Sequence, residues 1–156
     1  MTNKDLANVI FPNITKTIED YEKEYPERNL SDGACVTRFA PSPTGFMHIG
    51  HFMPALIDYV VAKNSGGVFF LRNEDTDKAR EQEGSMELIL EILEYYGIMP
   101  DEYQIKDKVV GSYGPYVQSE RMKTGIYMQY AKELIDKGEA YYCFCDKERL
   151  ATLKTE

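Results

Sequence analysis

Two histidines, His48 and His51, lie three residues apart, with Gly50 between them and a loop rich in proline and glycine before them. Apolar periodicity after the loop predicts a helix, and Pro54, which has no N–H, places its start no earlier than about Gly50 or His51. A helix N-terminus attracts phosphate, and imidazole N–H groups donate to phosphate oxygens. We therefore predict a phosphate site here, with Gly50 allowing a base or ribose to approach the backbone.

Two other interpretations of this pair stay open. The same residues are compatible with a tight loop that carries two partly exposed imidazoles and binds nothing. They are also compatible with a metal pair, although no cysteine or third histidine lies nearby to complete a ligand set.

The residues around the histidines follow the order strand, loop, helix, strand. A short β-prone run precedes the loop, and a Ser-Gly-Gly stop separates the helix from four apolar residues typical of a buried parallel strand. We predict strands over 34–39 and 68–71, joined by a loop over 40–45 and a helix over 49–64. This order is a βαβ unit, which places ligands at the carboxyl ends of its strands.

The remaining patterns also alternate between helix and strand, which indicates the α/β class. The spacing predicts two short N-terminal helices, the second starting near Pro12, followed by a linker over 25–33. After the βαβ unit it predicts a helix over 77–96 and a short strand at 109–110. A helix capped by Ser119 that stops at Gly138 and a strand over 140–145 complete the series. Asp146 is expected to cap one more helix, and we expect the chain to be truncated within it because no stop signal follows.

Composition argues against several classes of protein. The 18 Lys and Arg against 26 Asp and Glu give a net charge of −8, whereas a stand-alone nucleic-acid binder needs a basic surplus for phosphate contacts. Apolar stretches stop well short of the ~20 residues of a membrane span, so no membrane partner is expected, and the first thirty residues contain no secretory signal. Three cysteines do not suit a disulfide framework, which favours a cytoplasmic location.

The run TRFAPSPTGFMHIGH at 37–51 resembles the signature opening of class I aminoacyl-tRNA synthetases, with its last four residues standing as the HIGH motif in unaltered form. Three further segments are similar to the glutamyl-tRNA synthetase branch: LRNEDTD at 71–77, GPYVQSER at 114–121 and AYYCFC at 140–145. The resemblance covers residue 34 to about residue 150. Glutaminyl members usually carry other residues at four positions, namely Ser42, Thr44, Glu74 and Asp77.

The resemblance implies an ATP site at the loop and the following helix. It places His48 and His51 on the phosphates as catalytic residues, and Thr44, Gly45 and Gly50 in contact with the nucleotide. Charge develops on the α-phosphoryl group as an adenylate forms, so preorganised donors stabilise the transition state. ATP with Mg²⁺ is the expected nucleotide substrate.

The resemblance also implies a glutamate site. Arg38 and Ser42 would contact the amino acid, and Glu74 would receive its α-amino group. Free glutamate has two carboxylates and one ammonium, so its site requires cationic groups for the former and one carboxylate for the latter.

Nearby polar residues are assigned structural roles. For Asp75 and Asp77 we favour a solvated acidic loop or a cap of the helix that follows. Arg80 is expected to be a surface charge, and Ser119 and Arg121 to anchor a helix to the sheet.

Cys143 and Cys145 form a C-x-C pair that serves as half of a zinc site in some family members. Here the spacing is tighter than usual, and no His or Cys follows. Alternation along the predicted strand would place both thiols on one face, as in ordinary core packing. We therefore expect no metal in this chain and retain the pair only as a candidate half-site.

We expect three parts: an acidic helical extension over 1–30, the first half of a nucleotide-binding Rossmann-like catalytic domain with a parallel sheet and flanking helices over 34–145, and the start of an insert over 146–156. The implied activity is that of a glutamate–tRNA ligase, which forms glutamyl-adenylate from glutamate and ATP and transfers it to tRNA-Glu. Contacts with tRNA are expected mainly from regions absent here, and the isolated fragment is expected to be inactive. A glutamate-activating paralogue that modifies a tRNA base and a non-catalytic interaction module are the alternatives.

Overall fold

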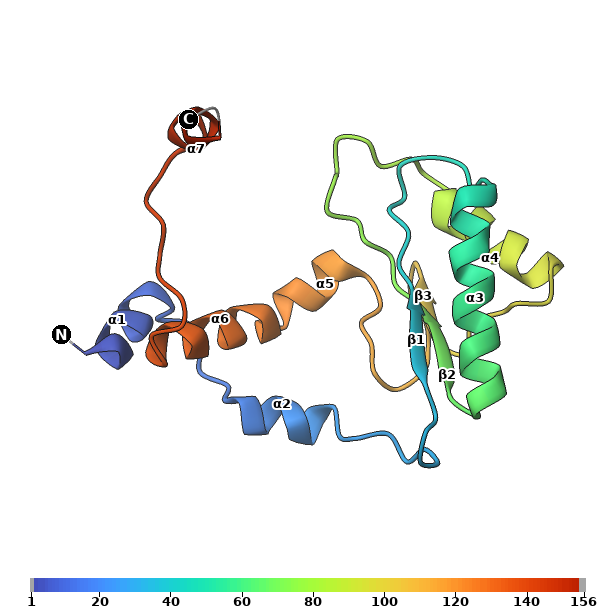
Figure 1. Cartoon of the computed structure of the whole chain (residues 1–156), viewed down its shortest axis with the longest axis horizontal. Coiled ribbons are helices and arrows are strands. Elements are labelled where there is room, and N and C mark those ends of the chain that lie inside the picture. Colours follow the sequence, from blue (N-terminus) through green and yellow to red (C-terminus); the bar gives the residue numbers. More distant parts are fainter. Residues whose placement is uncertain (1, 155–156) are drawn as a thin grey trace. The chain divides into compact units, whose positions relative to one another are not determined.

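The computed structural model describes residues 2–154, in which helices and strands alternate along the chain (Figure 1). In order, the elements are α1 (Asn3–Ile10), α2 (Ile18–Glu24), β1 (Val36–Phe39), α3 (Ile49–Ser65), β2 (Val68–Leu71), α4 (Ser85–Tyr95), β3 (Tyr103–Ile105), β4 (Lys108–Val110), α5 (Gln118–Lys123), α6 (Ile126–Asp136) and α7 (Lys147–Leu153). The predicted α/β class is confirmed. Contacts divide the described residues into two units, one up to Tyr21 and from Gly125 onward, the other Glu22–Thr124.

The predicted βαβ unit is confirmed within Glu22–Thr124. β1 and β2 pair in parallel, from Val36 opposite Val68 to Phe39 opposite Leu71, and α3 connects them. The core of this unit contains side chains from both strands, α3 and α4, as well as Ile98 and Tyr103. The carboxyl ends of β1 and β2 therefore lie at one edge of the sheet, where the residues that follow them can form a site.

α3 begins earlier than the proline rule predicts. His48 is its N-cap and Ile49 its first residue, so Pro54 is the sixth residue of the helix. The helix predicted over 49–64 is confirmed. The limit set by Pro54 is one residue late, because a proline in this position leaves only one early carbonyl without its helical partner. The predicted stop is confirmed, since Gly66 ends the helix in the left-handed conformation at φ 70°.

The helix predicted over 77–96 is shorter, because α4 starts at Ser85. Bonds to the loop after β1 hold the preceding residues outside the helix: Gln82 N–H donates to the Pro43 carbonyl at 2.8 Å, and Ser85 Oγ donates to the Gly45 carbonyl at 2.9 Å. Long-range hydrogen bonds thus replace the helical turn that the local pattern favoured.

A short antiparallel hairpin follows α4. Tyr103 in β3 lies opposite Val110 in β4, which confirms the strand predicted at 109–110. Leu71 N–H donates to the Glu102 carbonyl at 2.9 Å, and an isolated parallel bridge joins Phe70 to Glu102. These contacts place the start of the hairpin beside β2.

The single helix predicted from Ser119 to the stop at Gly138 is two helices, α5 and α6. Gly125, with φ 83°, separates them. Ser119 is not the cap, because Val117 occupies that position and Ser119 lies within the first turn of α5.

In the other unit, α2 starts at Ile18 and not near Pro12 as predicted. Reciprocal hydrogen bonds define this start: Thr17 N–H donates to Asp20 at 2.9 Å, and Asp20 N–H donates to Thr17 Oγ1 at 3.3 Å. Pro12 lies in a turn after α1.

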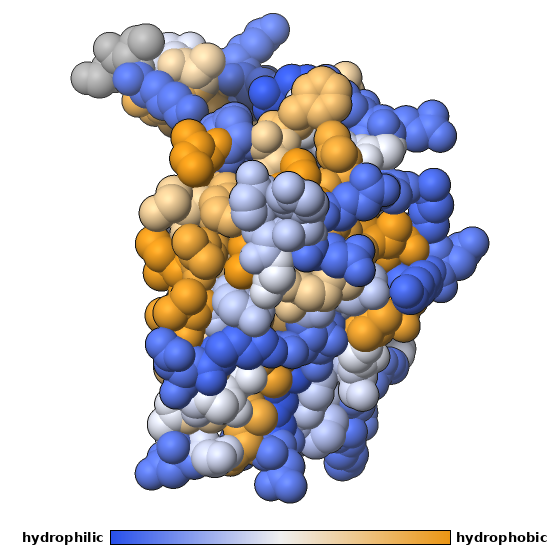
Figure 2. All heavy atoms as spheres, turned by 90° about the vertical axis from the view of Figure 1, so that its right-hand side faces the viewer, coloured by the Kyte–Doolittle hydropathy of each residue, from blue (hydrophilic) through white to orange (hydrophobic). Residues whose placement is uncertain are grey.

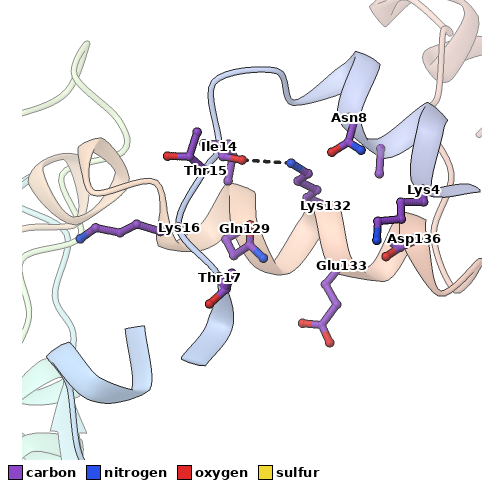
Figure 3. A pocket seen from close by; sticks show the side chains of 11 residues that line it. Lys4, Asn8, Ile14, Thr15, Lys16, Thr17, Gln129, Lys132, Glu133 and Asp136 are labelled. Carbon is purple, nitrogen blue, oxygen red and sulfur yellow. Dashed lines mark hydrogen bonds between the residues drawn. The ribbon is translucent and has the colours of Figure 1, made fainter. Parts of the chain in front are cut away.

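α1 packs against α6, and the loop after α1 returns along the same helix (Figure 3). Lys132 on α6 donates to the Ile14 carbonyl at 2.9 Å. The two helices and this loop enclose a cavity of about 270 Å³ whose lining includes Lys4, Lys16 and Asp136.

The strand predicted over 140–145 is not formed, and these residues are mostly exposed coil. A strand requires a partner, and no strand pairs with this segment in the part of the chain that the structure describes. The capping role of Asp146 is confirmed, because its carboxylate accepts from Arg149 N–H at 2.7 Å at the start of α7.

Figure 2 views the side on which α3 and α4 lie, where hydrophobic side chains gather among polar ones. Ile49, Met53 and Ile57 are exposed along α3. Over residues 2–154, every helix is too short or too polar to cross a membrane.

Candidate functional site

The two histidines lie at the N-terminus of α3. Nδ1 of His48 accepts from Gly50 N–H at 3.1 Å, so in the neutral ring the proton is on Nε2, which is available as an outward donor. The two imidazoles stack, with ring centroids 3.9 Å apart and planes at 28°. A Cβ on Gly50 would lie 3.0 Å from His48 Cε1, so glycine here lets the His48 ring pack closely against the helix start.

Burial lowers the pKa of His51, and the neighbouring His48 lowers it further. Both effects favour the neutral form of His51, which donates through one ring nitrogen. The pair offers imidazole donors beside the free N–H groups of a helix N-terminus, which is a suitable arrangement for phosphate oxygens.

The loop between β1 and α3 is fixed from both sides. Pro41 and Pro43 are buried, and their carbonyls accept from Glu74 N–H at 3.0 Å and Gln82 N–H at 2.8 Å. Ser42 between them is exposed, as expected of a residue that contacts a ligand. Thr44 and Gly45, predicted in the ATP site, are half-buried in the same loop.

Arg38 lies on β1, where neighbouring side chains point to opposite faces. Thr37 donates to the Asp58 carbonyl of α3 at 2.7 Å, and Phe39 enters the core, so Arg38 points away from that core. Its side chain is exposed and forms no ion pair with any described residue. Burial raises the pKa of Asp58 in α3, and the positive charge of Arg38 opposes this shift.

Glu74 follows β2 at the same edge of the sheet. Its carboxylate pairs with Arg72, and both side chains are partly exposed. Two buried atoms beside it, Arg72 Nε and Asn73 Oδ1, have no hydrogen-bond partner among the described residues. Since Glu74 N–H donates to the Pro41 carbonyl at 3.0 Å, the segments that follow β1 and β2 are in direct contact.

The interpretation of Asp75 as solvated was wrong. Asp75 is 3% exposed and accepts from Ser119 N–H at 2.8 Å, from Ser119 Oγ and from Lys78 Nζ at 2.5 Å. Burial opposes its ionisation, but the bonds from Lys78 and Ser119 outweigh this effect and lower its pKa. Ser119 therefore anchors α5 to the segment that follows β2, where the prediction had named the sheet itself.

Other nearby roles agree with the predictions in part. Asp77 is partly exposed and pairs with exposed Arg80 at 2.6 Å, but no helix starts there for it to cap. Arg121 donates to the Tyr113 carbonyl at 2.7 Å and the Pro115 carbonyl at 3.3 Å, so it ties α5 to the loop before it and not to the sheet as predicted.

Sequence reasoning missed an apolar cavity of about 350 Å³ beside His48. It is lined by Met47, His48, Ile49, Phe52, Ile92 and Tyr96. The first four lie at the end of the loop and the start of α3, whereas Ile92 in α4 and Tyr96 directly after it gave no signal because their proximity depends on tertiary packing.

Cys143 and Cys145 are exposed thiols, not core residues as the predicted strand implied. A hydrogen bond with Cys143 raises the pKa of Cys145. Among residues 2–154, no three His, Cys, Asp or Glu side chains are grouped so as to hold a metal. The zinc half-site therefore stays a prediction with two ligands.

Comparisons with known proteins identify relatives of this chain. The catalytic-domain model of class I tRNA synthetases (E and Q) matches residues 34–156. A glutamate–tRNA ligase of Lachnoclostridium phytofermentans is 58% identical over 119 residues, and one of Acetivibrio thermocellus is 46% identical over 157 residues; they cover 76% and 100% of this chain. A crystal structure of a glutamate tRNA ligase from Elizabethkingia meningosepticum, in complex with its amino acid, covers 80% of this chain at 42% identity and a TM-score of 0.65.

The chain spans 24% and 28% of the length of the two curated relatives and 24% of the solved chain. The family match nevertheless includes the loop, both parallel strands, the histidine pair and Glu74. The chain therefore belongs to the family of class I tRNA synthetase (E and Q) catalytic domains.

Proposed function

We propose that this chain binds ATP and glutamate in a glutamate–tRNA ligase. A carboxylate oxygen of glutamate attacks the α-phosphorus of ATP, the bond to the β-phosphate breaks, and pyrophosphate leaves. A ribose hydroxyl at the end of tRNA-Glu then attacks the acyl carbon, and AMP leaves as the ester forms. The single observation that carries the proposal is the stacked histidine pair at the N-terminus of α3, next to the edge of the sheet where Arg38 lies near the end of β1 and Glu74 follows β2.

In this proposal the histidines and the helix N-terminus bind the phosphates. The Nε2 donor of His48 and the neutral ring of His51 lie where charge develops on the α-phosphoryl group, and preorganised donors stabilise that charge. Thr44, Gly45 and Gly50 line the nucleotide site. These donors suit phosphate oxygens and not Mg²⁺, which prefers oxygen ligands, so we assign no Mg²⁺ ligand and expect the ion to arrive with ATP.

Glutamate binds at the edge of the sheet. Arg38, whose charge has no ion-pair partner among the described residues, binds a substrate carboxylate, and the exposed Ser42 hydroxyl adds a hydrogen bond. Glu74 receives the α-ammonium in exchange for Arg72. The proposal includes a cytoplasmic location, which the three free thiols favour.

The test is glutamate-dependent exchange of pyrophosphate into ATP by the complete gene product, with and without added tRNA. His51→Ala should lower the exchange rate about 10²–10³-fold, the usual loss for one preorganised donor. Arg80→Gln is the control near the site, because this arginine is an exposed surface charge paired with Asp77, and it should leave the rate unchanged. Unchanged exchange in His51→Ala would refute the assignment, and glutamyl transfer to a tRNA base instead of the terminal ribose would refute the second step.

A further inference from the structure

A segment outside the family match makes a well-shielded ion pair within the unit Glu22–Thr124. The family match begins at residue 34, yet Arg28 forms a two-pronged bond with Glu102, each N–O distance being 2.6 Å. The side chains are only 17% and 10% exposed. The Arg28 guanidinium also stacks on the Tyr113 ring, 3.8 Å from its centre. Such a pair fixes the orientation of both side chains, because the planar guanidinium forms two parallel hydrogen bonds with the carboxylate.

Glu102 passes this constraint to Tyr116. The Tyr116 hydroxyl donates to Glu102 Oε2 at 2.8 Å and accepts from Tyr113 N–H at 2.9 Å, while Tyr116 N–H donates to Gln104 Oε1 at 2.9 Å. Tyr116 is 2% exposed, and burial, together with the Glu102 carboxylate, raises its pKa to about 12. Tyr116 is thus held at its hydroxyl and its backbone.

The backbone around Tyr116 in turn holds both neighbours of Glu74. Asn73 N–H donates to the Tyr116 carbonyl at 2.8 Å, and Gln118 N–H donates to the Asn73 carbonyl at 2.9 Å. On the other side, Asp75 accepts from Ser119 N–H at 2.8 Å. Glu74 therefore lies between two residues that are fixed to the same segment, 116–119.

We propose that Arg28 is a positioning residue for Glu74, acting through Glu102 and Tyr116. The inference rests on the proposed function, in which Glu74 receives the α-ammonium of glutamate. It assigns to a segment outside the family match an effect on the amino-acid site and not on the ATP site. A misplacement of about 1 Å in a binding group can change rates by as much as 10²-fold, so a remote clamp of this kind has a measurable effect.

Gly111 gives an independent way to disturb the same contacts. A Cβ at this position would lie 2.5 Å from the Tyr116 hydroxyl and 2.7 Å from Glu102 Cγ, and its φ is 107°. Gly111→Ala must therefore displace the Tyr116–Glu102 contact without removing any charge.

The experiment measures KM for glutamate and for ATP in pyrophosphate exchange by the complete gene product. Arg28→Met should raise KM for glutamate about tenfold or more and leave KM for ATP unchanged, and Gly111→Ala should act in the same direction. Arg28→Lys should fall between, because lysine keeps the charge and loses the fork. Ile89→Val, a core change outside the network, is the control for general loss of stability and should move neither KM.

Hydrogen exchange at the Asn73, Gln118 and Ser119 amides supplies the second readout. These amides should exchange faster in Arg28→Met than in Ile89→Val. If these amides exchange hydrogen at an unchanged rate in Arg28→Met, the positioning role is overturned. It is also overturned if they exchange faster while KM for glutamate stays unchanged. Either result leaves the proposed function intact. Absence of glutamate-dependent activity in the unaltered protein would overturn the proposed function, and the positioning role with it.

Discussion

Replacing Asp75 by asparagine should destabilise the unit Glu22–Thr124 by about 2–3 kcal/mol at pH 7. The carboxylate is 3% exposed and accepts two hydrogen bonds from Ser119. Bonds to a charged group contribute about 1.5–3 kcal/mol, and an asparagine can keep one of the two only by turning its NH₂ donor toward the other donor. The bond from Lys78 is left out of this figure because that side chain is 60% exposed and screened by water.

The effect should depend on pH. The pKa of Asp75 in the folded protein lies below its ordinary value of 3.8. Near that pH the folded protein therefore binds fewer protons at this group than the unfolded chain does. The stabilisation is therefore fully present above about pH 4 and is lost as the pH falls through the folded-state pKa. The difference between Asp75→Asn and the unaltered chain should hold from pH 7 to about pH 4 and shrink below it.

Loss of the native Leu71 amide resonance with increasing urea measures this stability, because Leu71 N–H is bonded to the Glu102 carbonyl in the core of the unit. Asp77→Asn is the matched control: its partner Arg80 is exposed, so the loss should be below about 1 kcal/mol. An unchanged urea midpoint for Asp75→Asn, or a deficit as large at pH 3 as at pH 7, would refute the reasoning.

Two further predictions concern the histidine pair and the strand pair. In an NMR titration the pKa of His51 should lie below its ordinary value of 6.5. His48→Ala should raise this pKa only part of the way back, because the effect of burial remains. An unaltered pKa in that variant would refute an electrostatic contribution from His48. Gly67→Ala should lower stability by about 1–3 kcal/mol, since its Cβ would lie 1.9 Å from the Cys35 carbonyl oxygen. Gly66→Ala, where the space is open and only the φ of 70° is strained, is its control in the same urea assay; equal losses would contradict the clash.

The βαβ unit could be predicted because its signals are local. Apolar periodicity, the glycine stop at Gly66 and a four-residue apolar strand each act within a few residues. In the structure Arg38 and Glu74 lie at one edge of the sheet, since β1 and β2 run in the same direction. What each residue binds stays a prediction that rests on the resemblance.

The errors arose where distant residues decide the local conformation. α4 starts at Ser85 because bonds to Pro43 and Gly45 hold the residues before it, about forty positions away in sequence. The strand predicted over 140–145 failed for the opposite reason, since its β-prone residues have no partner strand among residues 2–154. Asp75 was misjudged because an acidic neighbourhood in sequence gave no sign of Ser119, 44 residues later.

The residues proposed for the chemistry lie close together in the sequence, whereas the residues that fix their geometry are far apart in it. The proposed binding residues lie in two short stretches, 38–51 and 74, which meet because β1 and β2 are parallel neighbours. Their positions depend on contacts across 44 residues, between Asp75 and Ser119, and across 74 residues, between Arg28 and Glu102. Loss of a buried, hydrogen-bonded group of this kind lowers the free energy of unfolding more than loss of an exposed charge does. A variant of Arg28 or Ser119 should therefore alter the glutamate site although neither residue touches glutamate in the proposed mechanism.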